Sequence, residues 1–307
     1  MIIAADSGGS KTLLRVCECA SIVDEIHMEG FGAALDSTED IPPLTQTLSQ
    51  LGSKYPIEAI AFNLGGRNKA QIENILQRVF PGVPFHVFRE SEGNAALALA
   101  SHYNSQCILL AGTGTIAIGK HPRTEEMILC GGWGYLLGDQ GSGYHIGITA
   151  LQHVIDQMDR TGPLDMLSQR ILGKEDGICC SKDITAICGS RDAVFYQLSP
   201  LTRSHIASYA RVVAACCAEQ DPVSLKIMAD AGKNMADIAA KALRKLKLPD
   251  VDGILVTGGL LNTRAYWQES FENALNTQFQ ITEFHYIPDG VIRGTQIIAA
   301  NLAQAKH

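Results

Sequence analysis

The chain has 307 residues, of which 46% are hydrophobic and 19% are charged, and its formal net charge is −7. This composition excludes an intrinsically disordered chain and predicts a compact protein with ample core, most naturally in two domains. The acidic balance, without a block of Lys or Arg, speaks against general binding of nucleic acids or anionic membranes. No run approaches the roughly eighteen apolar residues of a transmembrane helix, and Met1 leads directly into a strand-like run, so we expect a cytoplasmic protein.

The chain opens on a predicted β-hairpin whose turn has the composition of a binding loop. An apolar strand leads to a tight turn at residues 6–10, and an alternating run over residues 12–18 predicts the second strand. Residues 7–12 offer backbone N–H groups and hydroxyls, and Asp6 is placed to hold a cation through water. The glycines stand too close to the following lysine for a P-loop. A plain hairpin turn is an equally good interpretation of this segment taken alone.

Strands and helices then alternate. We predict strand 21–27, a glycine-bearing loop at 30–36, helix 38–51, strand 57–64, helix 68–80, strand 83–88 and helix 94–102. Gly65 and Gly66 follow the second of these strands, and Glu90 and Glu92 follow the third. Carboxylates at the carboxyl end of a strand in an α/β sheet lie where ligands usually bind. The two glutamates would suit equally the first turn of the next helix, where the helix dipole favours negative charge.

A second hairpin repeats the pattern of the first. Residues 107–111 and 116–120 predict two strands, and the turn between them, residues 112–115, reads Gly-Thr-Gly-Thr. The two hairpins are separated by about the length of one small domain. We therefore predict two related halves that face one cleft.

The most unusual segment is the glycine-rich stretch, residues 131–147, which holds seven glycines and a single carboxylate, Asp139. Glycines this dense predict backbone that approaches a ligand. Ser142 is placed to cap a helix that begins at about Gly143, so the stretch predicts a loop and a helix N-terminus ready for an anionic or polyhydroxylated ligand. A solvated surface loop is disfavoured by its apolar side chains, which are Trp133, Tyr135, Leu136 and Leu137.

The rest of the chain is mostly helical before it returns to strands. We predict helices at 142–159, 164–172, 184–188, 202–219 and 222–246, strand 251–256, helix 263–276, strand 283–287 and a final helix at 292–303. Between the strand at 251–256 and its helix stand Thr257, Gly258 and Gly259, which again suggest backbone packed against a ligand.

Taken in order, the glycine turns resemble the five-part ATP site of the actin, sugar kinase and heat-shock chaperone ATPase superfamily. DSGGSKT (6–12) resembles the first phosphate loop, AGTGT (111–115) the second and VTGGLLN (256–262) the adenosine loop, while NLGGR (63–67) and GTQIIAA (294–300) resemble the connecting segments. Within the superfamily, the glycine-rich stretch is similar to the GGWG-x-x-x-GDEGS run of N-acetylglucosamine kinases in the BadF/BadG/BcrA/BcrD-type ATPase family. The resemblance spans essentially the whole chain.

The resemblance implies an α/β fold of two ribonuclease H-like, actin-like ATPase domains around a central nucleotide and substrate cleft. A smaller N-terminal domain would comprise residues 1–106 and 293–307, and a larger C-terminal domain with a helical insertion would comprise residues 107–292. Asp6 would organise Mg²⁺. The implied ATP-binding residues are Asp6, Gly8, Gly9, Ser10, Lys11, Thr12, Gly112, Thr113, Gly114, Thr115, Gly258, Gly259 and Asn262.

The resemblance also implies a reaction, the transfer of the γ-phosphate of MgATP to the 6-hydroxyl of N-acetylglucosamine, glucosamine or a related amino sugar. The family's catalytic aspartate aligns with Glu90, and Glu92 or Asp139 could serve as the base instead. Asp36 stands where the family has a sugar-binding asparagine, and Gln140 where it has a glutamate. These two differences leave the identity of the sugar undetermined. The implied sugar-binding residues are Asp36, Gly65, Gly66, Gly131, Gly132, Asp139, Gln140 and Gly143, and we expect a homodimer without nucleic-acid or membrane partners.

Two other functions compete with a kinase. The alternative within the same broad family is an ATPase that activates an electron-transfer enzyme through an iron–sulfur cluster bridged by cysteines. None of the nine cysteines stands in a matching context. A filament-forming or chaperone-like ATPase is disfavoured by the chain length and by the sugar-kinase-like glycine-rich stretch.

Overall fold

The structure of the protein is a computed structural model, which describes residues 1–8, 11–19, 21–30, 40–65, 69–89, 93–121, 123–124, 126–160, 162–173, 201–247 and 251–305. The chain divides into two compact units, the smaller formed by Met1–Tyr103 with Asp289–His307 and the larger by Asn104–Pro288. The domain limits given above, 1–106 with 293–307 and 107–292, stay a prediction. Among the described helices, none has both the length and the apolar character needed to cross a bilayer.

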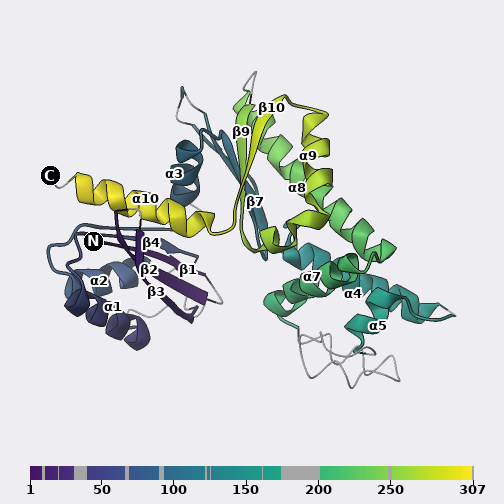
Figure 1. Cartoon of the computed structure of the whole chain (residues 1–307), viewed down its shortest axis with the longest axis horizontal. Coiled ribbons are helices and arrows are strands. Elements are labelled where there is room, and N and C mark those ends of the chain that lie inside the picture. Colours follow the sequence, from purple (N-terminus) through teal and green to yellow (C-terminus); the bar gives the residue numbers. More distant parts are fainter. Residues whose placement is uncertain are drawn as a thin grey trace. The chain divides into compact units, whose positions relative to one another are not determined.

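The smaller unit is built on a five-stranded sheet in the order β3-β2-β1-β4-β5 (Figure 1). β2 pairs antiparallel with both β1 and β3, whereas β4 and β5 extend the sheet in parallel from β1. The strands are β1 (Ile2–Ser7), β2 (Lys11–Glu18), β3 (Ser21–Glu29), β4 (Ala59–Leu64) and β5 (Phe85–Arg89).

Both faces of this sheet are covered by helices. Side chains alternate along a strand, so Ile3 packs with α1 (Pro42–Lys54) and α2 (Lys69–Val79) on one face. Ile2 packs on the other face with α3 (Asn94–His102) and α10 (Gly290–Gln304). Figure 1 shows α10 on the side of the sheet opposite α1 and α2. A sheet buried on both faces explains why β1 and β4 each begin with four consecutive apolar residues.

The larger unit repeats this topology. In its sheet, of order β8-β7-β6-β9-β10, β7 pairs antiparallel with both β6 and β8, whereas β9 and β10 extend the sheet in parallel from β6. The strands are β6 (Cys107–Ala111), β7 (Thr115–Lys120), β8 (Met127–Gly131), β9 (Val251–Thr257) and β10 (Ile281–Ile287). The predicted α/β class and the pair of related halves are confirmed by two sheets with one connectivity.

The core of the larger unit joins its sheet to several helices in one cluster. These are α4 (Gly143–Asp159), α5 (Met166–Ile171), α7 (Arg203–Ala218), α8 (Pro222–Leu246), the 3-10 helix η3 (Gly259–Tyr266) and α9 (Gln268–Asn276). α4 and α7 pack so closely that a Cβ added at Gly147 would lie 1.9 Å from the carbonyl oxygen of Ile206. Helix packing therefore accounts for the last glycine of the glycine-rich stretch.

Local sequence signals place most elements correctly. α3 and α8 have the predicted bounds, and Ser142 caps α4 as predicted, because its side chain accepts a hydrogen bond from the N–H of His145 at 3.2 Å. The helix expected at 263–276 is divided between η3 and α9, so that prediction is wrong. β8 is absent from the predicted elements. β8 is a short edge strand whose exposed residues, Met127 and Leu129, are apolar like the others, so it shows no apolar–polar alternation. The helix expected at 184–188 lies outside the described residues.

Candidate functional site

Asp6, near the end of β1 in the smaller unit, lies next to an amide. β1 and β4 pair in parallel with Asp6 opposite Asn63, and Asn63 Nδ2 donates a hydrogen bond to Asp6 Oδ1 at 2.8 Å. Burial raises the pKa of Asp6 above its ordinary value, while the hydrogen bond from Asn63 and the charge of Lys11 act in the opposite direction. Asp6 is thus a half-buried carboxylate whose only hydrogen-bond partner among the described side chains is neutral.

The adjoining ends of β1, β2 and β4 bring together other residues predicted to bind ATP or sugar. Ser7 Oγ and Thr12 Oγ1, both buried, lie 2.8 Å apart, and the N–H of Gly8 donates to the carbonyl of Lys11 at 2.9 Å. The N–H of Gly65, at the end of β4, donates to the carbonyl of Ser7 at 2.7 Å. The structure therefore places Asp6, Gly8, Lys11, Thr12 and Gly65 together where β1 and β4 end.

The β6–β7 turn of the larger unit, residues 112–114, is fastened to the start of α4. The N–H of Gly143 donates to the carbonyl of Gly112 at 2.8 Å, and the N–H of Tyr144 donates to the carbonyl of Thr113 at 3.3 Å. With the N–H of His145 bonded to Ser142, the first turn of α4 already has partners for these donors. The prediction that this helix N-terminus is ready for a ligand is therefore wrong, because the loop carbonyls occupy it.

The side chain of Asp139 is buried against the β6–β7 turn. It adopts a left-handed conformation, with φ at 61°, and only 2% of its surface is exposed. The N–H of Thr115 donates to Asp139 Oδ1 at 3.2 Å, and Nη2 of Arg203 donates to Oδ2 at 2.8 Å. A Cβ added at Gly114 would lie 2.4 Å from Arg203 Nη2 and 2.9 Å from each carboxylate oxygen, so the turn packs directly against this ion pair.

Arg203 was not among the residues that the sequence singled out. It is the first residue of α7, after the cap residue Thr202, and lies 64 positions from Asp139. An arginine at a helix start has no special pattern, so only the tertiary structure reveals this pairing. Beside the pair, Thr115 Oγ1 is buried and has no hydrogen-bond partner among the described residues.

Other parts of the glycine-rich stretch differ from expectation. Gly131 and Gly132 have φ values of 78° and 71°, and the N–H of Gly132 donates to the carbonyl of Thr115 at 2.9 Å. The structure thus gathers Gly131, Gly132, Asp139 and Gly143 around the β6–β7 turn, and Gln140 is exposed.

The apolar side chains of the stretch, which disfavoured a solvated surface loop in the sequence, are in fact exposed. They are exposed by 76% at Trp133, 44% at Tyr135, 80% at Leu136 and 81% at Leu137. The backbone turns sharply here, since the N–H of Gly138 donates to the carbonyl of Gly134 at 2.7 Å. The apolar side chains of this turn therefore stand largely in solvent, without a described partner surface that covers them.

The segment after β9 approaches the end of β6. Gly258 has φ at 111°, and a Cβ there would lie 2.4 Å from the carbonyl oxygen of Ala111, whereas a Cβ at Gly259 would meet nothing within 4 Å. The strand order explains the approach, because β9 is the parallel neighbour of β6. Gly258 is therefore required by close backbone packing, and Gly259 borders open space.

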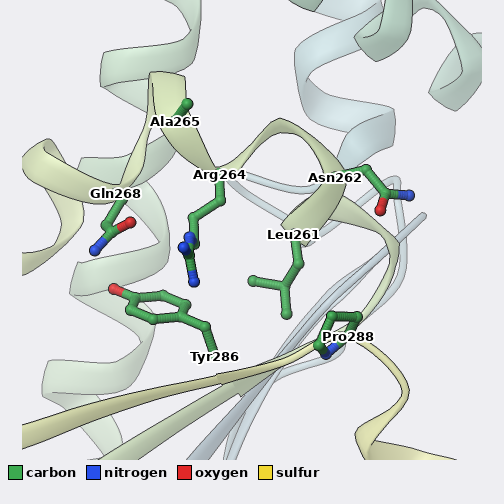
Figure 2. Close-up of a pocket in the computed structure, with 7 residues that line it drawn as sticks. All are labelled: Leu261, Asn262, Arg264, Ala265, Gln268, Tyr286 and Pro288. Carbon is green, nitrogen blue, oxygen red and sulfur yellow. The ribbon is translucent and has the colours of Figure 1, made fainter.

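A pocket of about 490 Å³ lies beside this segment, at the carboxyl end of β10 (Figure 2). Arg264 extends over the ring of Tyr286, with the guanidinium carbon 4.7 Å from the ring centroid. The hydroxyl of Tyr286 donates to Glu272 at 2.7 Å, and burial, with this carboxylate, raises the pKa of Tyr286. The pocket is lined by Leu261, Asn262, Arg264, Ala265, Gln268, Tyr286 and Pro288.

Several residues predicted for the site lie outside the described residues. They are Gly9, Ser10, Asp36, Gly66, Glu90 and Glu92. The neighbouring Gly93 is described and has φ at 68° at the start of α3. The base of the proposed reaction therefore rests on the sequence alone.

Comparisons with known proteins agree with this architecture. The chain is 24% identical over 309 residues to an N-acetylmuramic acid/N-acetylglucosamine kinase from Clostridium acetobutylicum, covering 97% of each protein. It is 26% identical over 198 residues to an N-acetyl-D-glucosamine kinase from Dictyostelium discoideum, covering 63% of this chain and 59% of that protein. A crystal structure from Porphyromonas gingivalis, provisionally named an N-acetylglucosamine kinase, has a TM-score of 0.70 at 15% identity and covers 98% of this chain and 99% of that one.

The structural likeness confirms the predicted fold of two actin-like ATPase units. The family model described as the BadF/BadG/BcrA/BcrD ATPase family matches residues 5–296. Because the match covers nearly the whole chain, the protein belongs to the BadF/BadG/BcrA/BcrD ATPase family.

Proposed function

We propose that the protein is an ATP-dependent sugar kinase that phosphorylates the 6-hydroxyl of N-acetylglucosamine or a related amino sugar. Membership of an ATPase family and two relatives named as N-acetylglucosamine kinases support a kinase of this type. The observation that carries the proposal is the pair of topologically equivalent hairpins, each ending in a glycine and hydroxyl turn with one carboxylate beside it.

The residues of the larger unit fit a nucleotide. Cβ atoms added at Gly112 and Gly259 would meet nothing within 4 Å, so other atoms can approach the backbone at both positions. The buried hydroxyl of Thr115 is available for a further hydrogen bond. We propose that the β6–β7 turn holds phosphates, and that the pocket between Leu261 and Tyr286 takes the nucleoside, with Asn262 at its edge.

The residues of the smaller unit fit a metal ion that is shared with phosphates. Among the described residues no group of three or more His, Cys, Asp or Glu side chains could hold a metal alone. Mg²⁺ is usually bound by one or two carboxylates together with substrate phosphates and water. Asp6, which has a neutral partner, suits that role, and Mg²⁺ bound there would neutralise charge on the outer phosphates. We propose that Gly8, Lys11 and Thr12 contact the same phosphates.

The proposed reaction forms one bond and breaks one. The 6-hydroxyl oxygen of the sugar bonds to the γ-phosphorus, the bond from that phosphorus to the bridging oxygen breaks, and ADP leaves. We propose that Glu90 accepts the hydroxyl proton, with Glu92 as the alternative. A base at this position contributes typically about a hundredfold or more, so Glu90→Gln should lower turnover by that order while the melting temperature is kept.

In this proposal Asp139 does not contact the sugar directly. Both of its oxygens already accept hydrogen bonds, and it is 2% exposed. We propose that it holds the β6–β7 turn and Arg203 in place. Gly143 is also withdrawn from the predicted sugar contacts, because its N–H donates to the carbonyl of Gly112. The other predicted sugar contacts are kept in the proposal: Asp36, Gly65, Gly66, Gly131, Gly132 and Gln140.

A panel of hexoses and amino sugars tests the proposal through coupled ADP release with MgATP. N-acetylglucosamine or glucosamine should stimulate release well above the basal ATPase rate, and phosphorus–proton correlation by NMR should place the product phosphate on the 6-position. Asp6→Asn, purified in parallel, controls for a contaminating kinase. No stimulation by any sugar would contradict the proposal.

The competing function as an activator of electron transfer predicts an iron–sulfur cluster. Of the cysteines in the described residues, Cys17, Cys107, Cys130, Cys216 and Cys217 are buried and only Cys19 is exposed, which does not suit a cluster shared between two proteins. Iron in an anaerobic preparation would revive this alternative.

A further inference from the structure

The pairing of Asp139 with Arg203 is asymmetric in exposure. The carboxylate is 2% exposed, whereas 41% of the arginine side chain is open to solvent. A buried carboxylate needs a partner, because burial without compensation disfavours its charge. That need is met by Nη2 of Arg203 together with the N–H of Thr115.

The guanidinium has donors beyond those that Asp139 uses. Arginine carries five N–H donors in a planar fork, and only Nη2 donates to a described residue of this protein. The fork also lies against Gly114, within the turn that we propose to hold phosphates. A fixed guanidinium with open donors suits phosphate oxygens, which arginine binds in a bidentate manner.

Two features of the turn point to a ligand beside this arginine. Space is open at Gly112, where a Cβ would meet nothing within 4 Å. The buried hydroxyl of Thr115, which follows Gly114 directly, has no hydrogen-bond partner among the described residues. An acceptor-rich ligand at the turn would satisfy both this hydroxyl and the remaining donors of Arg203.

We propose that Arg203 binds the outer phosphates of the nucleotide, and that Asp139 is a positioning residue that fixes the guanidinium against the β6–β7 turn. This inference rests on the proposed function. It assigns a cationic contact to the larger unit, in addition to the backbone N–H groups of the turn. It also explains how a carboxylate can stand beside a proposed phosphate site. The ion pair of Asp139 and Arg203 has no net charge, so it does not repel the phosphate.

Calorimetric titration with ATP and with AMP, both with Mg²⁺, tests the inference in the whole protein. Arg203→Met should weaken ATP binding by roughly ten- to a hundredfold, as expected for hydrogen bonds to a charged group. AMP lacks the outer phosphates, so its dissociation constant should change by less than about threefold. Arg203→Lys, which keeps the charge without the fork, should fall between Arg203→Met and the wild type.

The matched control is Arg211→Met. Arg211 lies on the same helix, is exposed, and has no role in the site. It removes the same charge from α7, so a general electrostatic effect on nucleotide binding would appear equally in both variants. ATP affinity reduced in Arg211→Met as strongly as in Arg203→Met would overturn the inference.

A double variant separates phosphate binding from a purely structural role. Arg203→Met alone leaves Asp139 buried without its cation and should lower the melting temperature. Adding Asp139→Asn should recover the melting temperature but not the preference for ATP over AMP. Recovery of both, or an unchanged preference in Arg203→Met, would show that the arginine serves only to neutralise Asp139.

Failure of this inference can be told from failure of the proposed function. If wild-type protein binds ATP and phosphorylates an amino sugar while Arg203→Met matches Arg211→Met, only the role of Arg203 is wrong. If wild-type protein does not bind ATP more tightly than AMP, both the inference and the kinase proposal are contradicted.

Discussion

The two hairpins share one topology, but the carboxylates beside them have partners of different charge. In the smaller unit Asp6 accepts a hydrogen bond from the neutral amide of Asn63 at 2.8 Å. In the larger unit Asp139 accepts one from the cation Arg203, also at 2.8 Å. The first carboxylate is left to attract a cation from solution, and the second already has one from the chain. One scaffold, used twice, thus provides a negative site and a site without net charge that presents arginine donors.

The comparison assigns the metal to the hairpin beside Asp6 and the arginine contact with phosphate to the hairpin beside Asp139. Burial raises the pKa of Asp6, which means that its ionised form lacks full compensation in the protein alone. A divalent cation would supply that compensation. Asp139 has no such need, because its two oxygens have the N–H of Thr115 and the guanidinium of Arg203.

Asp6→Asn should have the largest effect on activity. The amide keeps an oxygen for Asn63 but loses the charge that would organise Mg²⁺, so turnover with N-acetylglucosamine should fall by roughly a hundred- to a thousandfold. Steady-state rates over a range of Mg²⁺ concentrations check this. If excess Mg²⁺ fully restored the rate, Asp6 would contribute only to metal affinity, and near-normal rates at ordinary Mg²⁺ would contradict the assignment.

Asp139→Asn should have a smaller effect of a different kind. The amide oxygen can still accept from Thr115, but the ion pair with Arg203 is lost, so we expect a fall of roughly ten- to a hundredfold in kcat/KM for ATP. The response to Mg²⁺ should stay as in the wild type. A loss of the Mg²⁺ response in this variant would break the division between the two hairpins.

Alanine substitutions in the two turns should have different effects on stability and on ATP binding. A Cβ at Gly114 would collide with the ion pair, whereas a Cβ at Gly8 would meet only the carbonyl oxygen of Lys11 at 3.7 Å. Gly114→Ala should therefore lower the melting temperature by a few degrees, as for roughly 1–3 kcal/mol of overpacking, and weaken ATP binding. Gly8→Ala should leave the melting temperature nearly unchanged. Equal melting temperatures for the two variants would show that the ion pair is not held tightly against its turn.

The smallest predicted effect concerns stability and pH. A carboxyl whose pKa is raised on folding favours the folded state only when protonated, so its ionisation costs stability as the pH rises through that pKa. Asp6→Asn removes this cost and should raise the melting temperature at pH 8 by roughly 1–4 °C. The gain should vanish in acid, below about pH 4, where wild-type Asp6 is protonated too. An exposed carboxylate, Asp237, provides the control, and a gain that did not depend on pH would contradict the assigned cause.

Local signals in the sequence predicted the glycine turns and the helix cap of the site. They did not predict contacts between residues that lie far apart in the chain. Ser142 was placed correctly because a cap and its partner are three residues apart, and the glycine turns were located because glycine marks unusual backbone. The partner of Asp139 is 64 positions away on another helix, and no periodicity connects them. For the same reason the occupied N-terminus of α4 was missed, since the carbonyls that fill it come from the preceding hairpin.

Composition also misled where geometry decides exposure. The apolar side chains between Gly132 and Gly138 disfavoured a solvated loop, but Trp133, Leu136 and Leu137 are exposed on a tight turn. The spacing of the glycines could not separate those that border open space, such as Gly259, from those that packing requires, such as Gly147.

The most direct test of the division between the two hairpins is the increment that Mg²⁺ adds to ATP affinity, measured by calorimetry with and without the metal. Wild-type protein should bind ATP more tightly with Mg²⁺. Arg203→Met should bind ATP more weakly in both conditions but keep the same ratio, whereas Asp6→Asn should lose most of the ratio. An unchanged ratio in Asp6→Asn, or a ratio lost in Arg203→Met, would contradict the account.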